Sequence, residues 1–223
     1  MNALQLGTAS ILLASLTACG SAAIPPAPAQ AQVITAINGQ LIDSAATTVT
    51  LPANGKALAS APSDATGRFT LNLPDSVALA SLQTPLGQGL LKDLGCTGTL
   101  DVTDTGAQSF GVAMLQTPAA RYMNATVVRT LLSRSLVGKA YLYVDRATTA
   151  TGTLDCSAAT GMPTKVDVAL NVSAGWNVLA IYINGNVGLG GVSVSGRLQN
   201  GGGPVGEVSS WTDEKSIQTQ LGQ

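Results

Sequence analysis

The 223-residue chain contains no histidine. This absence excludes Ser-His-Asp and Cys-His catalysis, zinc or copper sites with histidine ligands, and a histidine-based pH switch. Aromatic residues make up 4% of the sequence and charged residues 10%, so sugar-binding platforms and paired carboxylates are also scarce. We therefore expect no enzymatic activity and no cofactor, and a protein that acts by contact.

Charge of either sign is low and evenly balanced. The chain has eleven basic and twelve acidic residues, and the basic residues occur singly along the sequence. Without a basic patch, we expect no nucleic-acid partner. Apolar residues make up 45% of the sequence, and small and β-branched types dominate, which is typical of an exported β-rich protein.

The chain begins with a short apolar leader whose core is 11–16, followed by Leu16-Thr17-Ala18-Cys19-Gly20. The leader is too short to span a membrane, which takes about 20 apolar residues, and it has the pattern of an export signal. It lacks the Lys or Arg that usually precedes the apolar core. The segment Leu16–Cys19 resembles the lipobox of bacterial lipoproteins.

This resemblance implies a signal peptide at 1–18 and a covalent lipid on Cys19, which would anchor the protein to a membrane. Gly20 is not the Asp that retains some lipoproteins at the inner membrane, so we expect an outer-membrane or cell-surface location. Residues 19–32 form a Pro/Ala linker that favours an extended spacer. A second site, Ala29-Gln30-Ala31 before Gln32, would instead release a soluble form.

Cys96 and Cys156 remain once Cys19 is lipidated. An even pair in an exported protein predicts a disulfide, although two separate buried thiols are the alternative. Closing a loop of roughly 60 residues would stabilise the fold by about 4 kcal/mol in the chain-entropy model.

From Val33 onward, short β-branched segments alternate with turn residues. The pattern predicts an all-β protein of antiparallel sandwiches, with a short helical or loop insert near 77–94. We expect a β-sandwich module at 33–118 and a second sandwich or sheet packed on it at 119–204. The polar tail at 205–223 is either loose or a short helix docked through Trp211, Ile217 and Leu221. A Cys96–Cys156 bond would cross the boundary and hold both halves in one body.

Turn signals divide the predicted strands. Asn38-Gly39 indicates a turn or bulge, and Asn54-Gly55 indicates a hairpin. Segments 165–172 and 176–183 predict a second hairpin. Segment 121–137 is compatible with strands or with a short amphipathic helix.

One part of this β region resembles a known module. It contains Asn38-Gly39-Gln40-Leu41, then Thr48-Val49-Thr50-Leu51, then Asp64-Ala65-Thr66-Gly67-Arg68-Phe69-Thr70-Leu71. In the last element Asp caps a turn, Gly takes a left-handed position and Phe begins the core face. About 40 residues thus resemble the β-sandwich of the transthyretin-like and carboxypeptidase-regulatory families, which implies an Ig-like accessory module without catalytic residues.

Three aromatic residues are candidates for contact. Tyr141 and Tyr143 share one face of a predicted strand and would form either an exposed stripe or core-edge packing. Trp176 would be a core or rim anchor at a hairpin mouth. Three carboxylates, Asp101, Asp104 and Asp155, match no calcium-binding loop, so we expect solvated turn residues and no metal site.

Two functional hypotheses remain open. The first is an accessory interaction subunit of an outer-membrane or surface-layer assembly, with an envelope protein as its partner. The second is a binding module for a small apolar ligand or glycan, held between the two halves. A pocket lined by Trp176, Tyr141 and Tyr143 would favour the second hypothesis, and a filled core there would favour the first.

Overall fold

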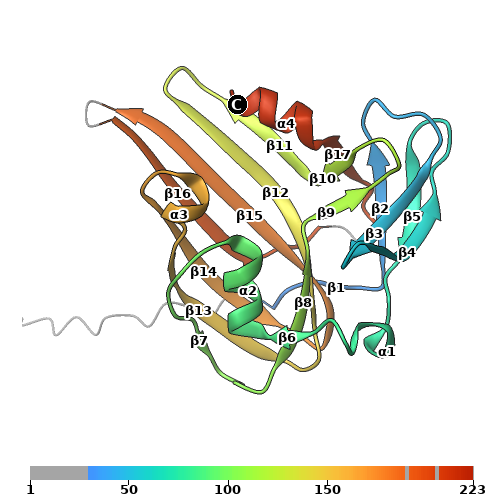
Figure 1. Cartoon of the computed structure of the whole chain (residues 1–223), viewed down its shortest axis with the longest axis horizontal. Coiled ribbons are helices and arrows are strands. Elements are labelled where there is room, and N and C mark those ends of the chain that lie inside the picture. Colours follow the sequence, from blue (N-terminus) through green and yellow to red (C-terminus); the bar gives the residue numbers. More distant parts are fainter. Residues whose placement is uncertain (1–29, 189–190, 204–205, 223) are drawn as a thin grey trace, which may run out of the picture.

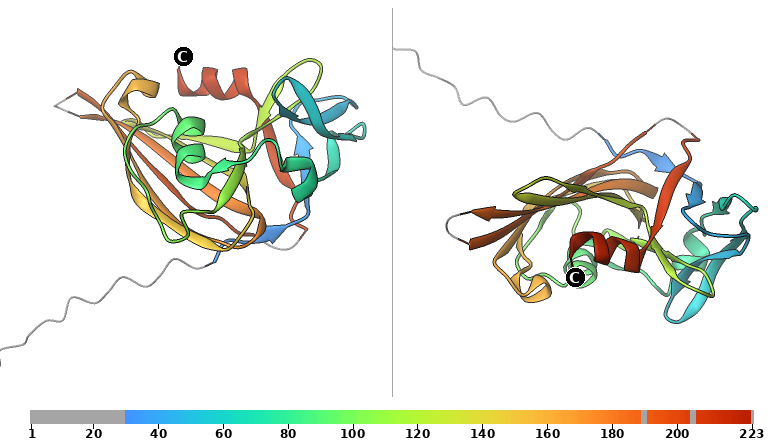
Figure 2. Two further views of the ribbon diagram at one scale, coloured as in Figure 1. Left: turned by 60° about the horizontal axis from the view of Figure 1, so that its bottom comes forward. Right: turned by 90° about the horizontal axis from the view of Figure 1, so that it is seen from above.

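The computed structural model describes residues 30–188, 191–203 and 206–222. These residues form a mostly β structure with seventeen strands in two sheets and four short helices. The two sheets lie side by side and both are curled (Figures 1 and 2). The expected signal peptide at 1–18 and Cys19 lie outside the described residues.

The large sheet contains ten strands. They are β1 (Val33–Ile34), β6 (Thr84–Pro85), β7 (Asp101–Val102), β8 (Gln108–Val112), β11 (Ala125–Arg129), β12 (Ser133–Val144), β13 (Thr148–Asp155), β14 (Thr164–Val172), β15 (Gly175–Gly188) and β16 (Gly191–Asn200). Their order is β6-β8-β12-β15-β16-β14-β13-β7, with β1 added to β15 and β11 added to β12. Helix α2 (Leu86–Leu94) lies in the hollow of this sheet (Figure 2), and α3 (Ser157–Thr160) joins β13 to β14.

The small sheet contains seven strands in the order β4-β3-β9-β10-β17-β2-β5. They are β2 (Ala36–Leu41), β3 (Thr48–Ala53), β4 (Lys56–Pro62), β5 (Arg68–Asn72), β9 (Met114–Gln116), β10 (Arg121–Met123) and β17 (Ser209–Asp213). Helix α1 (Ser76–Leu79) follows β5, and α4 (Glu214–Leu221) follows β17.

The buried side chains form two separate clusters. The first, which we call the aliphatic core, lies between α2 and the hollow face of the large sheet and includes Leu86, Leu90, Leu142, Val144, Leu154 and Leu170. The second, which we call the aromatic core, lies between the other face of that sheet and the small sheet, and includes Leu41, Leu51, Phe69, Leu71, Tyr141 and Trp211. Strands β12 and β15 contribute side chains to both cores, because successive residues of a strand point to opposite faces.

The prediction of a mostly β protein is confirmed, but the expectation of purely antiparallel sheets is wrong. Strand β14 runs parallel to β16 in the large sheet, and β17 runs parallel to β2 in the small sheet. The expected hairpin between 165–172 and 176–183 is also wrong. Gly175, with φ +101°, turns the chain into β15, and β16 then returns between β15 and β14.

The segment from Ala31 to Ile34 fills the place just beyond the end of β16. The Ala31 amide donates to the Asn171 carbonyl at 2.9 Å, and the Val178 amide donates to the Gln32 carbonyl at 2.9 Å. Ile34 pairs with Trp176 at the start of β15. The end of the expected linker is thus part of the large sheet.

The two Asn-Gly pairs behave differently. Asn54 and Gly55 both have positive φ, 49° and 75°, and join β3 to β4 as the two-residue hairpin turn that the sequence predicts. The prediction of a turn or bulge at Asn38-Gly39 is wrong, because β2 continues through both residues. Glycine is required at position 39 because a Cβ atom there would lie 2.4 Å from the Phe69 ring and 2.7 Å from Trp211 Nε1.

The sheets combine strands from distant parts of the sequence. The expected boundary at residue 118 falls between β9 and β10, which pair with each other in the small sheet. The chain passes from the large sheet to the small one at Ala113, which lies between β8 and β9. The expected insert near 77–94 contains α2 and most of α1, 121–137 forms strands, and the expected tail at 205–223 supplies β17 and α4.

Candidate functional site

Tyr141, Tyr143 and Trp176 lie together on the face of the large sheet that meets the small sheet. In the register of β12 and β15, Tyr143 is opposite Trp176 and Tyr141 is opposite Val178. The alternate residues Leu142 and Val144 point to the aliphatic core. The expected common face of the two tyrosines is thus confirmed, and the structure adds Trp176 to it.

All three side chains are buried. Trp176 is 4% exposed, Tyr141 4% and Tyr143 7%, and all belong to the aromatic core. The Trp176 ring meets Tyr143 edge-on at a centroid distance of 5.8 Å and Phe110 at 6.1 Å. Its Nε1 donates to the Pro74 carbonyl at 2.7 Å. Trp176 therefore anchors the start of β15 to the segment that leads into α1, and it presents no free face.

Tyr141 packs in the same core against a residue from the far end of the chain. Its ring stacks on Trp211 of β17 at a centroid distance of 6.0 Å. The Tyr141 hydroxyl accepts a hydrogen bond from Asn124 Nδ2 at 3.2 Å, and burial raises the pKa of this hydroxyl. The tyrosine thus joins the two sheets and stays neutral over the physiological range.

A small cleft lies next to Tyr141. Its volume is about 50 Å³, and Gln32, Lys139, Glu207 and Ser209 border it. The Lys139–Glu207 ion pair, at 2.9 Å, lies at its rim. Ligand pockets usually measure about 300–1,000 Å³, so this cleft has room for water molecules but not for a small apolar ligand or a sugar.

Two further residues complete this region: Trp211, which the sequence offers as a docking residue of the C-terminal segment, and Asn177, which it does not reveal. Trp211 is completely buried in the aromatic core, and Ile217 on α4 is also buried, so the docked-helix alternative for this segment is confirmed. Asn177 is also completely buried; its Nδ2 donates to the Ser173 carbonyl at 2.8 Å, and its Oδ1 accepts from the Ser173 amide at 2.9 Å. The only local signal for Asn177 is its place beside Trp176, directly after a glycine turn.

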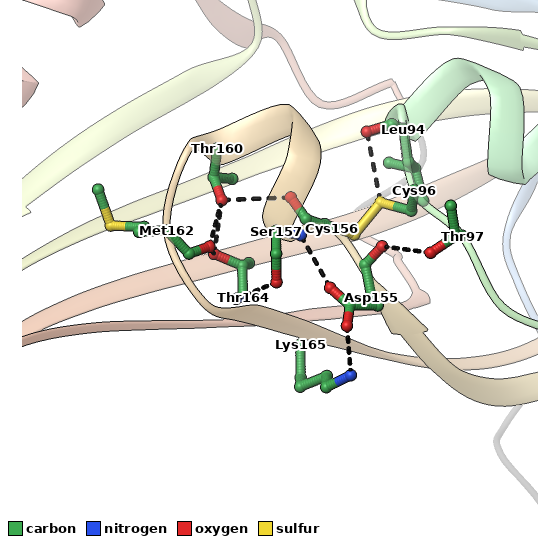
Figure 3. The surroundings of a disulfide bond; sticks show 10 residues. All are labelled: Leu94, Cys96, Thr97, Asp155, Cys156, Ser157, Thr160, Met162, Thr164 and Lys165. Atoms are coloured by element: carbon green, nitrogen blue, oxygen red, sulfur yellow. Dashed lines mark hydrogen bonds and ion pairs between the residues drawn. A yellow bond between two sulfur atoms is a disulfide. The ribbon is translucent and has the colours of Figure 1, made fainter.

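The structure joins Cys96 to Cys156 in a disulfide (Figure 3). Cys96 follows α2 and Cys156 precedes α3, and both belong to the aliphatic core. The bond therefore ties the helix in the hollow to the strand β13 on the wall of the large sheet. Next to it, Asp155 accepts a hydrogen bond from Lys165 at 2.7 Å, which holds the pKa of this carboxyl well below its usual range.

The three carboxylates Asp101, Asp104 and Asp155 do not converge. Asp104 forms an ion pair with Arg146 at 3.8 Å, whereas Asp155 pairs with Lys165 at another place on the sheet. Within the described part of the chain, no group of three His, Cys, Asp or Glu residues is arranged to hold a metal ion.

The Asp64 turn has the geometry that its sequence predicts. The Asp64 carboxylate accepts hydrogen bonds from the Thr66 amide at 2.8 Å and the Arg68 amide at 3.0 Å. Gly67 has φ +78°, and Phe69 begins the buried face of β5. An open groove of about 560 Å³ lies beside this turn. Polar residues, among them Asn38, Asp64, Arg68 and Thr70, and the apolar residues Pro62, Phe69 and Val208 line it.

No protein-family model, no curated protein and no solved structure matches this chain. Among residues 30–188, 191–203 and 206–222, no helix is long and apolar enough to cross a membrane.

Proposed function

We propose that this protein is a lipid-anchored cell-envelope protein that acts as a structural or accessory subunit, in contact with an envelope protein. The observation that carries the proposal is the filled interface between the two sheets. Trp176, Tyr141 and Tyr143 are at most 7% exposed, and the cleft beside them measures about 50 Å³. Because these side chains hold the sheets together, they are unavailable to a ligand. Contacts with other molecules are then made by the outer surface of the protein.

The N-terminal segment supports cleavage at Cys19 over cleavage after Ala31. Ala31 is 5% exposed in the aliphatic core, and Gln30 Nε2 donates to the Ser173 hydroxyl at 2.6 Å. Cleavage before Gln32 would remove both contacts and the bond from Ala31 to Asn171. Cleavage before Cys19 keeps them, and it leaves a Pro-rich spacer between the lipid and the large sheet.

The Asp64 turn supports the resemblance of residues 38–71 to a transthyretin-like or Ig-like module. In this segment β2 and β5 pair, as do β3 and β4, and Asp64, Gly67 and Phe69 take the roles that the resemblance implies. An accessory module of this kind stabilises or positions a partner, which agrees with the proposed role.

The anchor is tested by replacing Cys19 with Ala and following the protein in membrane and soluble fractions. We expect the Cys19→Ala chain to lose lipid labelling and to leave the membrane fraction, while Ser21→Ala, a matched change two residues away, stays membrane-bound. Equal membrane retention of both variants would refute the lipid anchor.

The partner is tested by cross-linking the intact envelope and identifying attached molecules by mass spectrometry. The exposed Lys56 and Lys215 side chains offer amine-reactive positions on the small sheet and on α4. One dominant protein attached at either position would identify the assembly. A chain that carries no protein partner would contradict the accessory role.

The alternative function is a binding module, and the polar groove beside Asp64 is the observation that favours it. Its volume of about 560 Å³ gives room for a sugar, and the Asn, Asp, Arg and Thr side chains in its lining offer hydrogen-bond partners to a glycan. Binding of envelope glycans to the intact chain, abolished by Arg68→Ala and kept by Lys56→Ala, would support this alternative.

A further inference from the structure

The turn between β11 and β12 exposes two neighbouring leucines. Leu131 is 98% exposed and Leu132 64% exposed, and Val128 on β11 is 54% exposed. Two-residue hairpin turns favour Asn-Gly or Asp-Gly, as at Asn54-Gly55 in the same protein. Two exposed leucines in a turn lower the solubility of the protein and bury little apolar surface on folding. Their presence therefore indicates a contact made by this surface.

The turn is held in one conformation by its flanking hydroxyl residues. The Thr130 amide donates to the Ser133 carbonyl at 2.9 Å, and the Ser133 amide donates to Thr130 Oγ1 at 3.0 Å. The two hydroxyls lie 2.7 Å apart. The leucines are therefore presented on a preorganised tip, which lowers the entropic cost of contact.

Two arginines form the base of this tip. Arg129 and Arg134 are opposite each other in the β11–β12 register. Arg129 donates to the carbonyls of Thr219 and Gln220 at the end of α4, and Arg134 donates to that of Leu221. Each guanidinium carries five N–H donors, so these bonds orient the arginines and leave donors for another acceptor.

The stretch of sequence that contains the tip carries basic residues and no acidic ones. The sequence has no acidic residue between Asp104 and Asp145, whereas four basic residues lie in that stretch. Arg121 pairs with Glu214 at 3.2 Å and Lys139 with Glu207 at 2.9 Å. Within the described part of the chain, the ion pairs do not include Arg129 or Arg134, so no carboxylate there neutralises either charge and both can still attract an external anion.

We propose that the β11–β12 turn binds the surface of a lipid bilayer that contains anionic headgroups. Leu131 and Leu132 enter the boundary of the acyl chains, and Arg129 and Arg134 contact the phosphates. The arginines lie two residues behind the leucines, about 7 Å along the strand, which matches the depth of about 5–10 Å that interfacial segments reach. A bilayer accepts a convex apolar tip of any shape, whereas a protein partner would need a matching apolar pocket.

This contact is separate from the predicted lipid anchor. Strand β1 pairs with β15 at Val33, opposite Asn177, and the tip lies beside Asn186 at the other end of β15. Nine residues of extended strand separate these positions, or about 30 Å. Figure 1 shows the β11–β12 turn and β1 at opposite ends of β15. The proposal therefore does not depend on acylation of Cys19, and its test uses an unacylated chain.

The test places an environment-sensitive fluorophore on the tip. A full-length Cys19→Ala chain carrying Leu131→Cys is labelled with nitrobenzoxadiazole, and the Cys96–Cys156 bond protects the other two cysteines. Vesicles of phosphatidylcholine with phosphatidylglycerol should shift the emission to the blue and expose the label to quenchers in the acyl region. The same label at Val77→Cys is the matched control, since Val77 is 82% exposed and lies on α1, outside the tip.

Further variants separate the two parts of the tip. In the labelled chain, Leu132→Ser should weaken vesicle binding about tenfold. Arg129→Gln with Arg134→Gln should remove the preference for phosphatidylglycerol over pure phosphatidylcholine. Because the label reports the turn itself, attachment of the chain through its apolar leader alone leaves the emission unchanged, and that outcome refutes the proposal. Cross-linking from position 131 to a protein, without a vesicle response, also refutes it and assigns the tip to a protein partner.

Discussion

The two cores of this protein are built from different side chains. The aliphatic core of the large sheet contains no aromatic residue among its described members and is closed by the Cys96–Cys156 bond. Seven of the eight aromatic residues of the chain pack in or against the aromatic core: Phe69, Phe110, Tyr122, Tyr141, Tyr143, Trp176 and Trp211. The eighth, Tyr182, is 40% exposed. The scarce aromatic residues thus join the two sheets, and a disulfide supports the core that lacks them.

The largest expected effect comes from removing the residue at the centre of the aromatic core. Trp211→Ala deletes a completely buried ring that contacts Tyr141 and Phe69. We expect the free energy of unfolding to fall by about 3–5 kcal/mol, because the deletion of a large core side chain leaves a cavity. Urea unfolding followed by far-UV circular dichroism measures this loss.

Tyr182→Ala is the matched control for this change, since it removes the one aromatic ring outside the aromatic core. It should change the free energy of unfolding by less than about 0.5 kcal/mol. Equal losses in the Trp211 and Tyr182 variants would contradict the division of roles between buried and exposed aromatic residues.

Removal of the disulfide tests how much this bond stabilises the aliphatic core. Replacing both Cys96 and Cys156 with Ala should lower the free energy of unfolding by about 2–4 kcal/mol, because the unfolded chain regains the freedom of a closed loop. Addition of a thiol reductant should destabilise the parent chain and leave the double variant unaffected. On a non-reducing gel the parent should migrate faster than after reduction, and identical migration once free thiols are blocked would show that the bond is absent.

Alanine variants of Gly67 and Gly55 compare a crowded glycine of the small sheet with an uncrowded one. Gly67 and Gly55 have nearly equal φ, +78° and +75°, but only a Cβ at position 67 would meet another atom, the Leu41 carbonyl oxygen at 2.4 Å. Gly55→Ala should cost about 1 kcal/mol from the left-handed backbone alone. Gly67→Ala should cost at least about 2 kcal/mol, since the steric conflict with β2 adds to the backbone strain. Equal costs in thermal unfolding would contradict the close approach at Gly67.

Local patterns in the sequence predict the local structure of this chain well. The Asp64 turn, the Asn54-Gly55 hairpin and the common face of Tyr141 and Tyr143 all follow from spacing and turn chemistry. Each of these features depends on residues that are close together in the sequence.

The pairing of distant strands is what the sequence does not show. Strand β17 pairs with β2 although about 170 residues separate them, and no local pattern assigns Trp211 to the same core as Phe69. Asn38-Gly39 is a turn signal in the sequence, whereas the reason for glycine at this position is the close approach of Phe69 and of Trp211, which comes from the other end of the chain. The filled aromatic interface, and with it the choice between the two functions, depends on these long-range contacts.

Two carboxylates, one beside each core, should respond to acid in opposite ways. Hydrogen bonds from Thr66 and Arg68 hold the pKa of Asp64 below its usual value, so this group stabilises the fold above about pH 4. That contribution is lost as the pH falls through the lower pKa of the folded state. Asp64→Asn should therefore be less stable than the parent at pH 7, with a difference that shrinks as the pH falls below about 4.

The pKa of Asp93 on α2 shifts in the opposite direction. Partial burial beside Gly111 raises the pKa of this carboxyl, so its ionised form costs stability at neutral pH. Asp93→Asn should be slightly more stable than the parent at pH 7. The difference should disappear below about pH 4, where Asp93 is protonated in both the folded and the unfolded chain. Thermal unfolding of Asp64→Asn and Asp93→Asn across this pH range measures both differences in stability. A loss of stability in Asp93→Asn at pH 7 would show that the carboxylate has a partner that stabilises its charge.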